Sequence, residues 1–110
     1  MRFCTLAYIP DAKIEDPRQI GTKILLATAG EEEGLRLFVH PNLTEIVKPE
    51  DASFIEQLFE DFVQRAKDAP ADLFEQLCSL SVGSLLTVDV GDLLTSSSPL
   101  TEPYSQFVPL

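Results

Sequence analysis

Three side chains are the candidate nucleophiles and bases of this chain: Cys4, Cys78 and His40 are its only cysteines and its only histidine. A reactive thiol needs a neighbouring base or positive charge that lowers its pKa. Cys4 lies in an apolar stretch, and Cys78 follows Leu77 on the apolar side of an expected helix. Both therefore fit better as small buried hydrophobic residues. Redox sensing by the pair would require a fold that brings the two thiols together and exposes them.

The usual motifs of catalysis, cofactor binding and metal binding are missing from the sequence. Its glycines form neither G-x-G-x-x-G nor the Lys-terminated loop that holds phosphates, and no C-x-x-C or H-E-x-x-H is present. The three glutamates at 31–33 lack the alternating spacing that wraps calcium, and they fit a solvated loop. We therefore expect no catalytic residue, no cofactor and no metal ligand, as in a protein that is not an enzyme.

Arg36 and His40 are the best candidates for ligand binding. They alternate with Phe38 along an expected strand at 35–39, and side chains two residues apart point to the same face of a strand. Strand ends and the loops after them often carry binding groups. A pocket near these residues gives the alternative function, which is small-molecule binding or a minor enzymatic activity. The competing interpretation is that His40 is solvated or hydrogen-bonded in a turn with Pro41.

The last sixteen residues, 95–110, differ in composition from the rest of the chain. Nine of them are Ser, Thr or Pro, which is typical of a tail outside the core. Tyr104, Phe107 and Leu110 are apolar anchors within it, and spaced anchors on an extended segment are common in partner recognition. These three are therefore candidate partner-binding residues. The alternative, which the sequence leaves open, is that the tail covers an apolar patch or a sheet edge of its own domain.

The clearest expected element is a helix over residues 49–68. Pro49 and the two acidic residues after it form a favourable helix start, and Ala69-Pro70 ends it. Apolar residues recur at spacings of one, three and four, which places them on one continuous face: Phe54, Ile55, Leu58, Phe59, Phe62, Val63 and Ala66. A second, shorter helix at 71–80 has its own apolar face.

Several stretches of the chain favour β-strands. Residues 3–9, 35–39 and 85–90 are rich in β-favouring types. Residues 16–30 fit either a helix that begins near Asp16 or a strand at 22–28. We favour the strand, because a glycine-bounded acidic loop would connect it to 35–39 as a hairpin. Residues 43–47 favour a further short strand.

The net charge of −10 limits the partners of this protein. Eighteen acidic and eight basic side chains are present, and residues 31–75 hold twelve of the acids against four basic residues. A phosphate backbone or an anionic membrane surface repels such a protein, so we expect no nucleic-acid binding. No stretch has the roughly 20 apolar residues of a membrane span, so we expect no membrane insertion. Two cysteines without a recognisable leader favour a cytoplasmic location.

These patterns predict an α+β fold: an antiparallel sheet of about four strands, covered on one face by helices at about 49–68 and 71–80. Residues 1–94 would form one globular domain, with 95–110 as its tail. The expected function is that of an acidic, non-enzymatic module for protein–protein interaction or assembly. Its partner would be another protein or a second copy of the same chain.

Overall fold

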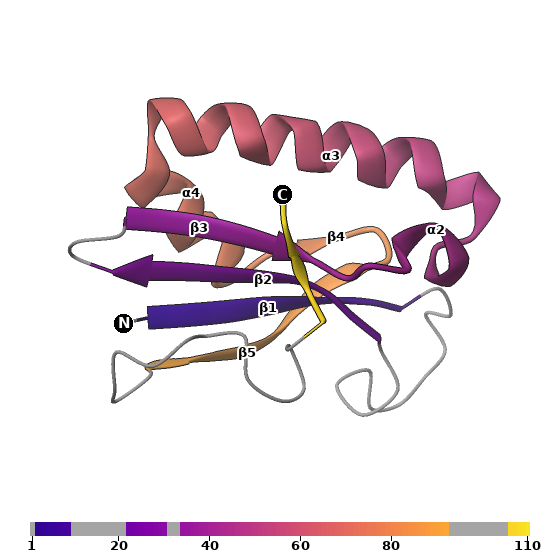
Figure 1. Cartoon of the computed structure of the whole chain (residues 1–110), viewed down its shortest axis with the longest axis horizontal. Coiled ribbons are helices and arrows are strands. Elements are labelled where there is room, and N and C mark those ends of the chain that lie inside the picture. Colours follow the sequence, from indigo (N-terminus) through magenta and orange to yellow (C-terminus); the bar gives the residue numbers. More distant parts are fainter. Residues whose placement is uncertain (1, 10–21, 31–33, 93–105) are drawn as a thin grey trace.

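The α+β class is confirmed by a computed structural model, which describes residues 2–9, 22–30, 34–92 and 106–110. An antiparallel sheet of six strands has the order β4-β5-β1-β2-β3-β6. The helices cover one face of this sheet (Figure 1). In chain order the elements are β1 (Arg2–Tyr8), β2 (Thr22–Gly30), β3 (Gly34–Val39), α2 (Leu43–Ile46), α3 (Pro49–Asp68), α4 (Pro70–Leu77), β4 (Ser81–Val82), β5 (Leu85–Asp92) and β6 (Val108–Pro109).

The central strand of the sheet is β1, which lies between β2 and β5. Its pairing with β2 shifts register between Leu6 and Ala7, and its pairing with β5 shifts between Thr5 and Leu6. Such bulges bend a strand and increase its twist. The predicted hairpin is confirmed, because β2 pairs with β3 from Leu25↔Val39 to Gly30↔Gly34. The alternative of a helix over residues 16–30 is wrong for residues 22–30, which form β2, and residues 16–21 lie outside the described part of the chain.

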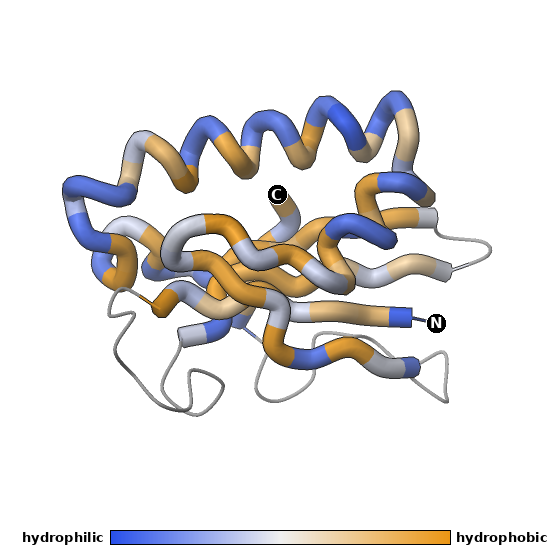
Figure 2. The backbone as a smooth tube through the Cα atoms, turned by 180° about the vertical axis from the view of Figure 1, so that it is seen from behind, coloured by the Kyte–Doolittle hydropathy of each residue, from blue (hydrophilic) through white to orange (hydrophobic). Residues whose placement is uncertain are grey.

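The helix α3 has the bounds that the sequence predicts. Pro49 occupies the first turn with Glu50 and Asp51, and Arg65 and Lys67 lie in the last turn, so both ends complement the helix dipole. Figure 2 shows hydrophilic residues along its outer face and hydrophobic residues on the face toward the sheet. The buried residues of α3 are Ile55, Phe59 and Phe62, and the last two stack with ring centroids 5.9 Å apart.

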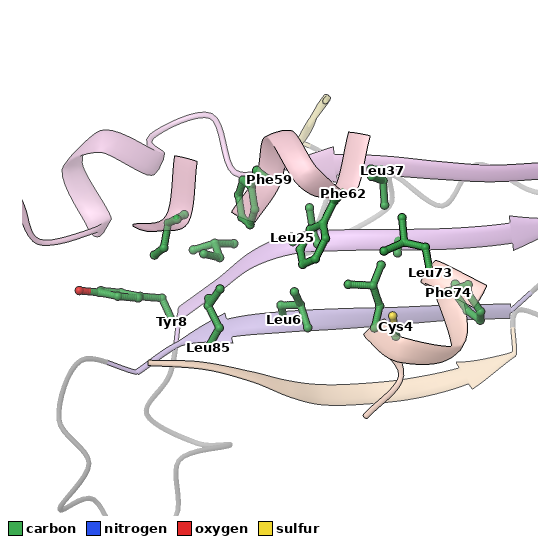
Figure 3. Packing of buried hydrophobic residues seen from close by; sticks show 14 of the residues in the cluster. Cys4, Leu6, Tyr8, Leu25, Leu37, Phe59, Phe62, Leu73, Phe74 and Leu85 are labelled. Atoms are coloured by element: carbon green, nitrogen blue, oxygen red, sulfur yellow. The ribbon is translucent and has the colours of Figure 1, made fainter. Parts of the chain in front are cut away.

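The main core lies between the sheet and the helices (Figure 3). Alternate residues of β1 point into it, because side chains along a strand alternate between faces: Cys4, Leu6 and Tyr8. Leu73, Phe74 and Leu77 of α4 complete this layer. A smaller cluster of Leu26, Phe38 and Phe107, with Phe3 packed against it, is separate from this core.

Two details of the predicted helices and strands are corrected by the structure. Residues 43–46 form a helical turn instead of a strand, which lets Leu43 and Ile46 both pack against the core. The second helix ends at Leu77 instead of residue 80. Thr87 is the reason, because its hydroxyl donates to the Leu77 carbonyl (2.5 Å) and accepts from the Leu80 N–H (2.9 Å). The chain is thereby diverted into β4.

The sheet also has six strands where the sequence predicts about four. Two of them, β4 and β6, contain only two residues each and make edge pairings that no hydrophobic pattern marks. Phe54 departs from prediction as well, since 41% of its surface is exposed although it falls within the apolar pattern of α3. Phe54 lies near the start of α3. Its ring is 3.8 Å from the point where a side-chain Cβ at position 83 would lie if Gly83 were replaced by another residue.

Candidate functional site

The ligand candidates and the partner candidates of the sequence converge on one edge of the sheet. Arg36 lies on β3, and His40 directly follows that strand. Phe107 and Leu110 lie at the two ends of β6, the strand that pairs with β3. Tyr104 lies outside the described residues. The candidate site is therefore the outer edge of β3, together with the segment of residues 106–110 that lies along it.

The segment 106–110 covers only the second half of β3. Phe38 pairs with Pro109 and Val39 pairs with Val108, and the Leu110 N–H donates to the Leu37 carbonyl at 2.9 Å. Backbone groups of alternate residues face the same neighbour in an antiparallel ladder. Pro109, which has no N–H, therefore occupies the position whose N–H would point away from β3. No described strand pairs with the outer edge of β3 at Gly34–Arg36.

Phe107 anchors the segment in a small hydrophobic cluster on the sheet. It is only 7% exposed and packs with the fully buried Leu26 and Phe38. The His40 ring meets it edge-on, with centroids 5.5 Å apart and planes at 64°. Such aromatic pairs add roughly 0.5–1.5 kcal/mol beyond the buried area. His40 is held in this position because its Nδ1 accepts the Asn42 N–H at 3.0 Å.

A groove of about 320 Å³ continues along this edge between β3 and α3. The Arg36 guanidinium lies over the Phe38 ring at 5.3 Å, and Lys67 forms part of the α3 wall. The other lining residues are apolar: Leu35, Leu37, Phe38, Val63, Ala66, Pro109 and Leu110. The described lining thus has two cations and no carboxylate, in a protein whose net charge is −10. His40 is not part of this lining, so Arg36 and His40 do not share one pocket.

A second depression, of about 300 Å³, lies between the start of α4 and the ends of β2 and β3. Its polar groups already have partners within the chain. Arg2 donates to Glu75 at 2.9 Å and lies 5.0 Å from the centroid of the Phe74 ring. The ion pair raises the pKa of Arg2 and keeps the guanidinium charged. The two charged side chains that line this depression, Arg2 and Glu75, are therefore already paired with each other, which leaves few polar groups for a ligand.

Cys4 and Cys78, which are far apart in the sequence, both belong to the main hydrophobic core. Cys4 is buried on β1, and Cys78 is the half-buried residue that caps α4. Burial raises the pKa of Cys4 to about 12, with the neighbouring Cys78 as a smaller cause. Burial also raises the pKa of Cys78, although the nearby Cys4 and the charge of Arg2 act in the opposite direction.

Metal and membrane features can be assessed for the described part of the chain. No group of three or more His, Cys, Asp or Glu side chains in residues 2–9, 22–30, 34–92 and 106–110 is arranged to hold a metal ion. No helix in these ranges has both the length and the apolar character needed to cross a membrane.

Comparisons of the chain with protein-family models, curated proteins and solved structures found no match. The function must therefore be inferred from the geometry of this chain alone. The sheet edge is its most distinctive feature, since the structure gathers there four of the five residues that the sequence singled out.

Sequence reasoning missed the α3 side of the groove. Val63, Ala66 and Lys67 were assigned to a helix, but nothing in their spacing says which strand lies beneath them. The one available signal was Lys67, a cation near the end of a strongly acidic helix. Only the packing of α3 on β3 reveals that Lys67 and Arg36 line the same groove.

Proposed function

We propose that this protein is a non-enzymatic interaction module that binds an extended segment of a partner protein along the outer edge of β3. The observation that carries the proposal is the docked segment 106–110. In support, the chain's own segment places an aromatic anchor, and an aliphatic residue three positions later, along this edge. Addition of a strand to a sheet edge is a common mode of peptide recognition, in which backbone bonds give affinity and side-chain pockets give specificity.

The partner segment should carry acidic residues after its aliphatic anchor. Leu110 lies opposite Leu37, and the strands are antiparallel, so the next residue of a bound peptide would lie opposite Arg36. The cations Arg36 and Lys67 flank this continuation of the groove. Their charge complements carboxylates, and complementary charge favours the right partner and speeds association. A partner that pairs with β3 at Gly34–Arg36, where no described strand pairs with its outer edge, also gains backbone bonds that residues 106–110 do not make.

The chain's own segment is the competitor that any partner must displace. A tethered segment competes at an effective concentration that an untethered peptide must overcome. Loss of the Phe107 anchor should therefore raise the affinity for an added peptide. Val108 provides a matched control, because it belongs to the same strand but is 45% exposed.

The test is fluorescence polarisation with a labelled peptide, Gln-Phe-Val-Pro-Leu-Glu-Glu, and the full chain. The Phe107→Ala protein should bind this probe at least about tenfold more tightly than the native protein, since 1.4 kcal/mol of lost competition is tenfold. Val108→Ala should match the native affinity within about twofold on the same scale. A probe with Ala in place of Phe should not bind.

Charge is tested by two substitutions on α3 that change the net charge equally. Lys67→Gln removes a cation from the groove, and Gln64→Glu adds an acid at an exposed position that does not line it. Only Lys67→Gln should weaken binding substantially. The proposal fails if folded Phe107→Ala does not bind the probe at all. It also fails if both α3 variants weaken binding equally, since that result would indicate a general charge effect.

Small-molecule binding near Arg36 and His40 is the other outcome of this test. A small ligand that binds the native chain and is lost on Arg36→Ala substitution, with no binding of the peptide probe, would favour that alternative.

A further inference from the structure

We infer that the partner segment carries an apolar residue at the second position after its aliphatic anchor, and that this side chain binds in the depression between the start of α4 and the ends of β2 and β3. This inference rests on the proposed strand addition to β3 and specifies the sequence of the partner. Leu35 lines both the groove beside α3 and the depression beside α4, so the two meet at this residue. They meet along the part of β3 where no described strand pairs with its outer edge.

The antiparallel register places the second residue after the aliphatic anchor opposite Leu35. Leu110 lies opposite Leu37 and donates its N–H to the Leu37 carbonyl at 2.9 Å. Residues two positions apart repeat the same hydrogen-bonding role in an antiparallel ladder, so a residue opposite Leu35 gains the equivalent backbone bond. Leu35 and Leu37 both pack on the main core. Residues directly opposite share a face, so the partner's side chain lies on the face of the sheet that the helices cover.

The depression lies over one row of the sheet that a bound strand would extend. Arg2 pairs with Ala29, and Ala29 pairs with Leu35, so these residues lie side by side on β1, β2 and β3. All three line the depression, which has a volume of about 300 Å³. A partner residue opposite Leu35 becomes the fourth member of this row. Its side chain therefore lies beside the depression without any movement of the sheet.

The lining of the depression favours an apolar side chain over a charged one. Pro70, Ala71 and Phe74 of α4 contribute apolar surface, and the charged groups in the described lining, Arg2 and Glu75, already pair at 2.9 Å. A charged peptide residue would lose hydration there without an unpaired opposite charge. An apolar residue instead removes apolar surface from water. The partner segment thus has an aromatic residue, an aliphatic residue three positions later, and an apolar residue two positions after that.

The test compares labelled peptides by fluorescence polarisation on the full chain. The probe Gln-Phe-Val-Pro-Leu-Glu-Leu carries the apolar residue opposite Leu35, and Gln-Phe-Val-Pro-Leu-Glu-Ser lacks it. The first should bind at least about fivefold more tightly, because it buries an additional apolar side chain. Competition by residues 106–110 lowers both affinities alike. The ratio of the two affinities is therefore expected in the native chain and in Phe107→Ala.

Two protein variants locate the effect at the depression. Ala71→Asp places a carboxylate in it, at an exposed position in the first turn of α4, where the helix dipole favours acids. This variant should reduce the ratio to within about twofold. Gln64→Glu adds the same charge at an exposed position of α3 that lines neither the groove nor the depression. It should leave the ratio at about fivefold or more.

The results that overturn this inference differ from the result that overturns strand addition itself. Equal binding of the Leu and Ser probes would leave strand addition intact and exclude the depression from it. Equal binding of the isomeric probe Gln-Phe-Val-Pro-Leu-Leu-Glu and the Leu probe would indicate general hydrophobic attraction, since the second leucine of the isomer lies on the other face. Tighter binding of Gln-Phe-Val-Pro-Leu-Glu-Glu than of the Leu probe would assign the position to Lys67 in the groove. Failure of every probe to bind would overturn strand addition and this inference together.

Discussion

The two phenylalanines at positions 54 and 62 provide a sharp test of how α3 packs. Both belong to the same apolar pattern in the sequence, but Phe62 is 2% exposed and Phe54 is 41% exposed. Truncation of a buried Phe to Ala removes its transfer free energy and leaves a cavity, which costs about 3–5 kcal/mol. The substitution also removes the stacking of Phe62 with Phe59, whose ring centroids are 5.9 Å apart. We therefore expect Phe62→Ala to lower the free energy of unfolding by about 3–5 kcal/mol.

Phe54→Ala is the matched variant, with the same chemical change on the same helix. Part of its ring is already in water, and Ala is favoured over Phe in a helix by a few tenths of a kcal/mol. Its cost should stay below about 1.5 kcal/mol, because only part of a Phe transfer free energy is lost. Equilibrium urea unfolding of the three proteins gives both values, provided that the slopes agree. Similar losses for the two variants would refute the assigned orientation of α3.

Further predictions concern buried polar contacts and pH. Tyr8→Phe should cost about 1–3 kcal/mol in urea unfolding, because the buried hydroxyl donates to Asp51 at 2.5 Å and accepts the Lys48 N–H at 3.2 Å. Thr87→Val should cost about 1–3 kcal/mol, since it leaves the Leu77 carbonyl and the Leu80 N–H without their shared partner; a change within error would mean that water replaces the hydroxyl. Burial raises the pKa of Cys4 from 9.0 to about 12, so the folded state resists its ionisation. The resulting stability is fully present below pH 9 and should be lost as pH rises toward 12; thermal unfolding across this range should show a smaller loss for Cys4→Ala than for the native protein.

Most of the sheet and helix layers could be predicted from periodicity. The helix at 49–68 was predictable to the residue because Pro49 and Pro70 punctuate a long apolar pattern. The hairpin of β2 and β3 was predictable because glycines bracket the turn. The apolar pattern does not predict which side chains in the first turns of α3 face the sheet. Phe54 has the spacing of a core residue, but 41% of its surface is exposed.

The site was predictable only in pieces. Arg36, His40, Phe107 and Leu110 could each be singled out by type and position, but the sequence placed them in two unrelated hypotheses. Their convergence depends on a pairing of two residues between β3 and β6, which carries no local signal. The placement of Cys4 and Cys78 in the same core was unpredictable for the same reason, since it depends on how α4 packs on the sheet. Long-range contacts of this kind follow from the whole packing and not from any window of sequence.

The central position of β1 has a consequence for how the chain folds during synthesis. Its pairs with β5 join residues from Tyr8↔Leu85 to Arg2↔Asp92, the latter 90 positions apart. Such distant contacts slow folding, because the loop entropy is lost before the contacts form. While a ribosome is still making β5, one side of β1 has no partner strand, and unpaired edges invite aggregation. The emerging chain is therefore most exposed to misassociation just before β5 leaves the ribosome, when a chaperone would protect it most.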